Sequence, residues 1–281
     1  PAGVFNLVPG TGVVVGDALS RHKDIDMVSF TGSTGAGIKV AQAAAPTVKR
    51  VMQELGGKSP FIITEDADLA SAVKYGVEDV MLNSGQTCTT FSRMLVPQAQ
   101  YAQAIELAKE LAQSLILGTT EDAFLGPVSS KAHQQRILNY IQVGIDEGAT
   151  LVCGGADKPE NIERGFYVKP TIFADVHNKM RIAQEEIFGP VLCIIPYQDI
   201  DEAIEIANDT PFGLCSAVFA KDDTTAMNIA KKIRAGQCMI NGGVFNYLAP
   251  FGGYKQSGNG REFTLQGVEE FLETKAMITC N

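Results

Sequence analysis

The stretch Met27-Val28-Ser29-Phe30-Thr31-Gly32-Ser33-Thr34-Gly35 decides the fold class of this chain. Its first four residues form an apolar run of strand length, and the five that follow form a turn with two glycines. Residues 36–45 then have the composition of a helix. A strand, a short turn and a helix in this order predict one unit of an α/β fold.

The same alternation continues along the chain. Asp68 is placed to cap a helix that runs to about Leu82, and apolar residues recur at helical spacing between Tyr101 and Leu117. Further strand-like runs lie at residues 51–54, 61–63, 94–96, 191–196, 216–219 and 237–241, and further helical patterns at 129–147, 200–208 and 224–235. We therefore expect an α/β fold with a mostly parallel sheet.

Composition and charge exclude several classes of protein. Of the 281 residues 45% are hydrophobic, which is enough for a substantial core, and the net charge is −9. A nucleic-acid-binding protein needs a basic face, so we expect no nucleic-acid partner. No apolar run approaches the roughly 18 residues of a membrane span, and the N-terminus lacks the pattern of a signal peptide, so we expect no membrane association. Because the sequence starts at Pro1 without an initiator Met, we expect it to begin inside a longer protein.

The cysteines and histidines indicate a reducing compartment and no metal site. The six cysteines are scattered without a CxxC pair, and the three histidines lie far apart among polar neighbours. Four of the cysteines lie in apolar, strand-like surroundings typical of small buried residues: Cys153, Cys193, Cys215 and Cys238. We therefore predict a cytoplasmic protein without a bound metal.

One cysteine has different surroundings. Cys88 follows Asn83-Ser84-Gly85-Gln86-Thr87, a segment of small and polar residues. A thiolate stabilised by nearby backbone amides would be a strong nucleophile near neutral pH. Glu54, followed by the flexible Leu55-Gly56-Gly57, is the candidate base for that thiol. The alternatives are a helix-end cysteine without function and a strand-end glutamate that faces water.

Three further segments have side chains suited to a cofactor or a substrate. The turn Phe30–Thr34 precedes a helix N-terminus, where free N–H groups and the helix dipole suit a phosphate, although an ordinary capped turn has the same pattern. Glu186 lies two residues before Phe188, so a carboxylate for ribose hydroxyls accompanies a ring that can pack on a flat heterocycle. Near the C-terminus, Phe245 and Phe251 could line an apolar entrance. Taken alone, each of these segments is more often a case of plain packing or an ordinary capped turn.

Taken together, in this order and spacing, these segments resemble the NAD(P)-dependent aldehyde dehydrogenase superfamily. The resemblance spans nearly the whole chain and rests on five stretches: Phe30–Thr34, Glu54–Pro60, Gly85–Cys88, Glu185–Pro190 and Pro250–Gly258. It implies an oxidoreductase that uses NAD or NADP to oxidise a small-molecule aldehyde to a carboxylic acid. The implied fold consists of three parts: the remainder of a Rossmann-like dinucleotide-binding domain (1–56), an α/β catalytic domain (57–256), and a segment that returns to the cofactor domain and supplies an oligomerisation strand (257–281).

The resemblance also implies a role for each site residue. Cys88 would be the nucleophile that forms a thiohemiacetal and then a thioester, with its backbone N–H as one oxyanion donor. Glu54 would be the general base that activates water to hydrolyse the thioester. The remaining implied contacts are with the cofactor and the aldehyde tunnel: Gly32 and Ser33 to the pyrophosphate, the Leu55 backbone to the nicotinamide amide, Glu186 to the nicotinamide-side ribose, Phe188 beside it, and Phe245 and Phe251 in the tunnel.

The sequence departs from the family on its N-terminal side. The chain contains no Trp and no Pro-Trp-Asn-Phe-Pro-like segment, so the family's oxyanion-hole amide and its adenosine-ribose lysine have no counterpart here. Two functions therefore stay open: an aldehyde-oxidising enzyme of which this is the C-terminal portion, or a truncated, catalytically incompetent fragment that acts as a folded domain or an oligomer partner. The resemblance implies a homodimer or homotetramer, and it leaves open both the aldehyde and the choice between NAD and NADP.

Overall fold

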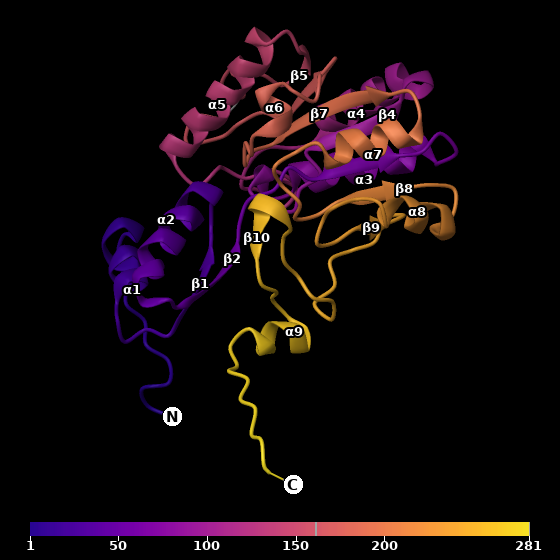
Figure 1. Cartoon of the computed structure of the whole chain (residues 1–281). Helices are drawn as coiled ribbons and strands as arrows, with labels where there is room; N and C mark the ends of the chain where they lie inside the picture. The colour runs from indigo at the N-terminus through magenta and orange to yellow at the C-terminus, as the bar shows by residue number, and fades with distance from the viewer. Residues whose placement is uncertain (161, 281) are drawn as a thin grey trace.

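The central strands of the larger sheet are apolar on both faces, and such strands are stable only between two layers of helices. The computed structural model, which describes residues 1–160 and 162–280, has this arrangement (Figure 1). In sheet order the strands are β5 (Thr150–Cys153), β6 (Thr171–Ala174), β7 (Val191–Tyr197), β4 (Arg93–Pro97), β3 (Pro60–Ile63), β8 (Ala217–Phe219) and β9 (Met239–Ile240). Neighbouring strands are parallel except for β5 and β6.

Alternate residues of these strands face different helices, as the two-residue period of a strand requires. The helices that cover the sheet are α3 (Leu69–Met81), α4 (Tyr101–Ser114), α5 (Lys131–Asp146), α6 (Arg181–Gln184), α7 (Ile200–Asn208) and α8 (Asp223–Ala230). Phe61 packs with the apolar side chains of α3 and α4, whereas its neighbour Ile62 packs with those of α7 and α8. Cys193 of β7 packs with α5 and α6. The core therefore lies on both faces of the sheet, with one cluster against α3 and α4 and two clusters on the opposite face.

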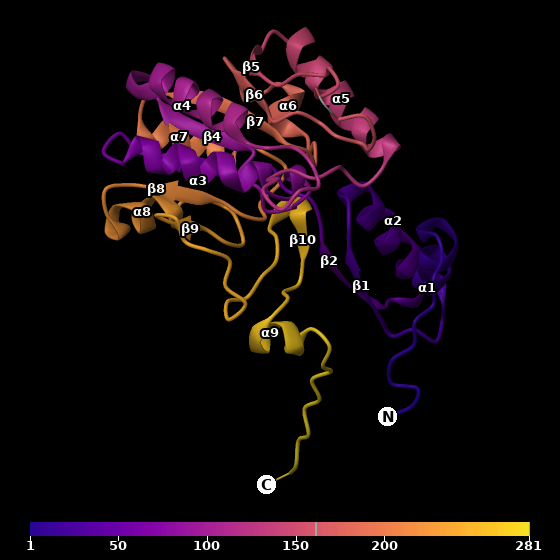
Figure 2. The same ribbon diagram turned by 180° about the vertical axis from the view of Figure 1, so that it is seen from behind.

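The smaller sheet carries the turn that was proposed to bind phosphate. Its elements are β1 (Met27–Thr31), α2 (Thr34–Ala44), β2 (Arg50–Glu54) and β10 (Gly258–Asn259), with α1 (Asp17–Arg21) before them and α9 (Thr264–Glu269) after them. β1 and β2 are parallel, and β10 is antiparallel to β2. Both ribbon views show β2 and β10 reaching the end of α3 at the centre of the molecule (Figures 1 and 2). Single turns of 3-10 or π geometry lie at Gly12–Gly16, Ala45–Thr47, Leu82–Gly85, Gln98–Gln100 and Lys255–Ser257.

The predicted α/β fold with a mostly parallel sheet is confirmed, with small differences in the element boundaries. Asp68 caps α3 as predicted, since its carboxylate accepts the N–H of Ser71 at 3.2 Å. The helix expected to reach Leu117 ends at Ser114. Residues 273–280, which resemble an oligomerisation strand, are exposed and have no regular structure, because a strand needs a partner to hydrogen-bond. The three-part domain division stays a prediction, and no helix in the described ranges is long and apolar enough to cross a membrane.

Candidate active site

The segment that leads to Cys88 has a tightly constrained backbone. Asn83, Ser84 and Gly85 follow α3 with positive φ angles of 51°, 55° and 72°. A side chain on Gly85 would lie 2.1 Å from the backbone of Gly189, so this position accepts only glycine. These small residues therefore set the direction in which the chain presents Cys88.

The segment after Glu54 lies directly against the Cys88 segment. A Cβ on Gly57 would be 2.5 Å from the backbone oxygen of Cys88, and one on Gly56 would be 2.4 Å from a carboxylate oxygen of Glu186. The two glycines were expected to give Glu54 freedom to swing. The structure shows instead that they allow three segments to pack closely, which fixes Glu54 beside Cys88.

Glu54 is a buried carboxyl group whose acidity is strongly altered. Its side chain is only 5% exposed, and burial raises its pKa to about 8, while hydrogen bonding with the Cys88 thiol lowers it and the negative charge of Glu262 raises it further. The contact with the thiol is loose, because neither carboxylate oxygen has a partner at hydrogen-bond geometry within the described part of the chain. A carboxyl group with a pKa near 8 is matched to general-base chemistry close to neutral pH.

Cys88 does not have the lowered pKa that its small, polar neighbours suggested. Burial raises the pKa of its thiol to about 12, and the carboxyl groups of Glu54 and Glu186 raise it as well. A backbone N–H does lower the thiol pKa, but less than burial and the two carboxyl groups raise it. Because the protonation of one group affects the protonation of the other, the titration near pH 8 is a property of the Glu54–Cys88 pair and not of one residue.

The structure brings Glu186 and Phe188 close to Glu54 and Cys88. The Glu186 carboxylate accepts the N–H of Gly57 at 3.2 Å, and burial raises its pKa. Phe188 has a positive φ of 60°, its carbonyl oxygen lies 2.7 Å from Nε2 of His133, and the two rings pack edge to face. A non-glycine residue with this φ is held by its surroundings.

The turn Phe30–Thr34 is connected to the segment of Glu54 through backbone contacts. Ser33 caps α2 by accepting the N–H of Ala36 at 3.3 Å, and the N–H of Gly32 donates to the backbone oxygen of Glu54 at 3.1 Å. Leu55 donates its N–H to Ser257 at 3.0 Å and packs its side chain beneath α2. The turn and Glu54 therefore occupy fixed positions relative to each other.

Phe245 and Phe251 belong to a group of aromatic rings at the C-terminal side of the site. Phe245 packs edge to face on Phe251 at 5.4 Å and on Tyr247 at 5.1 Å between ring centroids, and Phe263 closes the group. Phe251 and Glu54 line the same small pocket. Phe251 therefore brings the aromatic group next to Glu54, and the assignment of Phe245 and Phe251 to a substrate tunnel stays a prediction.

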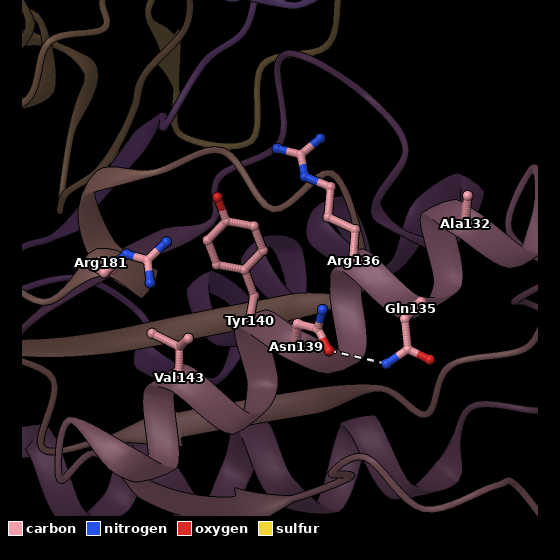
Figure 3. A pocket seen from close by; sticks show the side chains of 7 residues that line it. All are labelled: Ala132, Gln135, Arg136, Asn139, Tyr140, Val143 and Arg181. Atoms are coloured by element: carbon pink, nitrogen blue, oxygen red, sulfur yellow. Dashed lines mark hydrogen bonds between the residues drawn. The ribbon is translucent and has the colours of Figure 1, made fainter.

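Several residues near the site were not singled out in the sequence. Glu262 and Arg261 lie close enough to Glu54 to alter its pKa, and the Lys58 ammonium is buried near Glu186. Arg136 donates to the backbone oxygen of Glu186 at 2.7 Å and, with Arg181, flanks the ring of Tyr140 (Figure 3). None of these has a local sequence signal, because each reaches the site from a distant element.

Comparison with known proteins shows the family of this chain. The model of the aldehyde dehydrogenase family matches residues 1–277. A 3-succinoylsemialdehyde-pyridine dehydrogenase from a Pseudomonas species is 51% identical over 280 residues, which is 99% of this chain. The chain belongs to the aldehyde dehydrogenase family.

Solved aldehyde dehydrogenases superpose on most of this chain. Aldehyde dehydrogenase C of Pseudomonas syringae, a cysteine-to-alanine mutant complexed with NAD+ and octanal, is 53% identical with a TM-score of 0.96, and the match covers 98% of this chain and 57% of that one. The Mycobacterium tuberculosis aldehyde dehydrogenase complexed with NAD+ is 45% identical with a TM-score of 0.89, and the match covers 91% and 53%. This aldehyde dehydrogenase chain spans 59% of the length of its Pseudomonas relative.

Proposed function

We propose that the protein oxidises an aldehyde to a carboxylic acid with NAD or NADP, using Cys88 as the nucleophile and Glu54 as the general base. The observation that carries this proposal is the buried pair of a thiol and a carboxyl group with a pKa near 8, in a chain of the aldehyde dehydrogenase family. A buried thiol with no proton acceptor would have no means of forming a nucleophile.

In the proposed reaction, ionised Glu54 removes the proton of the Cys88 thiol. The thiolate then forms a bond to the aldehyde carbon, and the backbone N–H of Cys88 donates to the oxyanion. When bound, the oxidised nicotinamide accepts the hydride that leaves this carbon. Glu54 then loses the thiol proton to solvent and, ionised again, takes a proton from the water that attacks the resulting thioester. This proton passes to the Cys88 sulfur as the C–S bond breaks, which releases the carboxylic acid and restores the thiol.

The residues present suit part of a dinucleotide. We assign the pyrophosphate to the N-terminal end of α2, where Gly32 leaves the backbone open and Ser33 supplies a hydroxyl group. Glu186, only partly satisfied by the Gly57 N–H, retains carboxylate acceptor capacity for ribose hydroxyls, and Phe188 lies beside it. Leu55 contributes backbone groups next to this position. None of these residues discriminates NAD from NADP.

We also propose that the protein is a cytoplasmic homodimer or homotetramer. Apolar side chains of the C-terminal segment, Phe271, Leu272, Met277 and Ile278, are exposed. A second copy would bury them and supply the strand partner that residues 273–280 lack. The thiols of this chain are free, which suits a reducing compartment.

A second candidate function is a folded domain that does not turn over by itself. Apolar side chains near the N-terminal side are exposed: Val4, Phe5, Val13, Val14 and Val48. Such a surface is suited to a covering partner. In this alternative the Glu54–Cys88 pair is intact but the oxyanion donors and the cofactor site are incomplete.

The test compares three variants by formation of reduced nicotinamide with a short alkyl aldehyde. Cys88→Ala should abolish oxidation, and Glu54→Gln should leave a slow enzyme that accumulates a thioester, seen as added mass on Cys88. The matched control is Cys153→Ala, a half-buried cysteine of β5 far from Glu54, which should retain full activity. Normal turnover by Cys88→Ala would refute the assignment, and a wild-type chain that neither binds NAD nor turns over would support the folded-domain alternative.

A further inference from the structure

A carboxylate on α3 holds the end of the segment that presents Cys88. Asp79, two residues before the end of α3, accepts the backbone N–H of Phe91 through Oδ2 at 2.8 Å. β4 begins only at Arg93, so Phe91 lies outside the strand ladder and its buried N–H needs an acceptor from elsewhere. Asp79 supplies this acceptor.

The other end of the segment is held by polar side chains. Gln86 accepts the N–H of Ser129 through its side-chain oxygen at 2.8 Å, and Ser84 donates to the backbone oxygen of Gly126 at 2.7 Å. Asn83 and Gln86 also exchange side-chain to backbone hydrogen bonds at 3.1 Å. Only residues 87–90, with Cys88 among them, lie between these bonds and the one made by Asp79.

A buried ionisable group at this position carries a desolvation penalty. Burial raises the pKa of Asp79 to about 6, although the Phe91 N–H lowers it. The groups that share its surroundings are Tyr75 of α3 and Cys215 before β8, and the Asp79 charge raises the pKa of both. An apolar side chain would avoid this penalty but would leave the Phe91 N–H without an acceptor.

We propose that Asp79 is a positioning residue for Cys88: its hydrogen bond to Phe91 fixes the segment 87–90 and keeps the thiol beside Glu54. The inference rests on the proposed role of Cys88 as the nucleophile. Aromatic packing of Phe91 on Tyr75 and Phe61, at 5.7 and 5.8 Å between centroids, anchors the Phe91 side chain but leaves the direction of its N–H free. The Asp79 carboxylate is the acceptor toward which that N–H points.

The test measures the alkylation of Cys88 by iodoacetamide in the full chain, followed for each cysteine by peptide mass spectrometry. Asp79→Leu should loosen the segment and let the thiol leave Glu54 and Glu186, the two titratable groups that raise its pKa. A fall of one unit in that pKa raises the thiolate fraction, and with it the alkylation rate at pH 8, about tenfold. Asp79→Asn retains an acceptor oxygen and should stay within about threefold of the wild type. The exposed Cys280 is the internal control and should react at one rate in all three proteins.

An Asp79→Leu protein that folds and alkylates at Cys88 with the wild-type rate and pH profile would overturn the proposal. If Asp79→Leu does not fold, hydrogen exchange of the Phe91 amide provides the test. This amide should be protected from exchange in the wild type and in Asp79→Asn, and unprotected exchange of it in either protein would overturn the proposal. Neither measurement needs cofactor or turnover. Absence of aldehyde oxidation would therefore count against the proposed function, whereas the role of Asp79 is decided by the alkylation and exchange measurements.

Discussion

The buried carboxyl group of Glu54 should make the protein less stable as the pH rises. Its pKa is about 8 in the folded chain, against roughly 4.3 for an unperturbed glutamate. At a pH between these two pKa values, Glu54 is ionised in the unfolded chain and protonated in the folded chain, so folding takes up a proton. The stability from this group is complete below the unfolded pKa and is lost as the pH rises through 8.

The size of the effect follows from the same two values. The linkage slope is at most about 1.4 kcal/mol per pH unit for one proton, so the interval from pH 6 to pH 8 removes up to about 2.7 kcal/mol. Asp79, with a pKa raised to about 6, contributes mainly below that interval. For a domain of this size the loss corresponds to a fall in Tm of roughly 5–10 °C.

The assay is urea or thermal unfolding of the wild type and of Glu54→Gln at pH 6 and pH 8. Glutamine has nearly the same shape and no titrating proton, so the variant should lose much less stability than the wild type over this interval. The informative quantity is the difference between the two proteins, which cancels the other titrating groups. Equal losses in both proteins would show that Glu54 is ionised in the folded chain at neutral pH, and would refute the reasoning.

Two further substitutions test the local geometry. Gly85→Ala should destabilise the protein by more than about 2 kcal/mol, because φ is +72° and the new Cβ would lie 2.1 Å from Gly189. The matched control Gly35→Ala lies in the open first turn of α2 and should not lower stability. Similar urea midpoints for the two variants would contradict this account. Ser33→Ala removes the cap of α2 and should lower the free energy of unfolding by about 1 kcal/mol, whereas Ser33→Thr keeps an acceptor and most of the stability. Equal unfolding midpoints for both variants would show that the cap contributes nothing.

Sequence patterns predicted the fold because the strands and helices are locally encoded. The run 27–30 is strand, Ser33 and Asp68 are helix caps, and the apolar period between Tyr101 and Ser114 is a helix, all as predicted. Boundaries were less certain at helix C-termini, where no side chain marks the end. The assignment of 273–280 as an oligomerisation strand stays a prediction, since strand formation depends on a partner and not on the segment alone.

The site was predictable only as a set of candidates. The residues Cys88, Glu54, Glu186 and Phe188 stand out because small, polar or glycine-rich segments accompany them. Their convergence depends on close backbone contacts at Gly56, Gly57 and Gly85, which no periodicity reveals. Asp79 escaped notice because an aspartate within a helix has no special pattern until its partner, the Phe91 N–H, is known.

The sequence by itself determined the α/β class, the family resemblance and the choice of Cys88 and Glu54 as candidates for nucleophile and base, since these follow from residue type and order. Only the tertiary structure decided their acidity. Local residues suggested a lowered pKa for the Cys88 thiol, whereas burial and the carboxyl groups of Glu54 and Glu186 raise it to about 12. Burial also raises the pKa of Glu54 to about 8. The physical reason is that desolvation and charge proximity depend on what packs around a group in space.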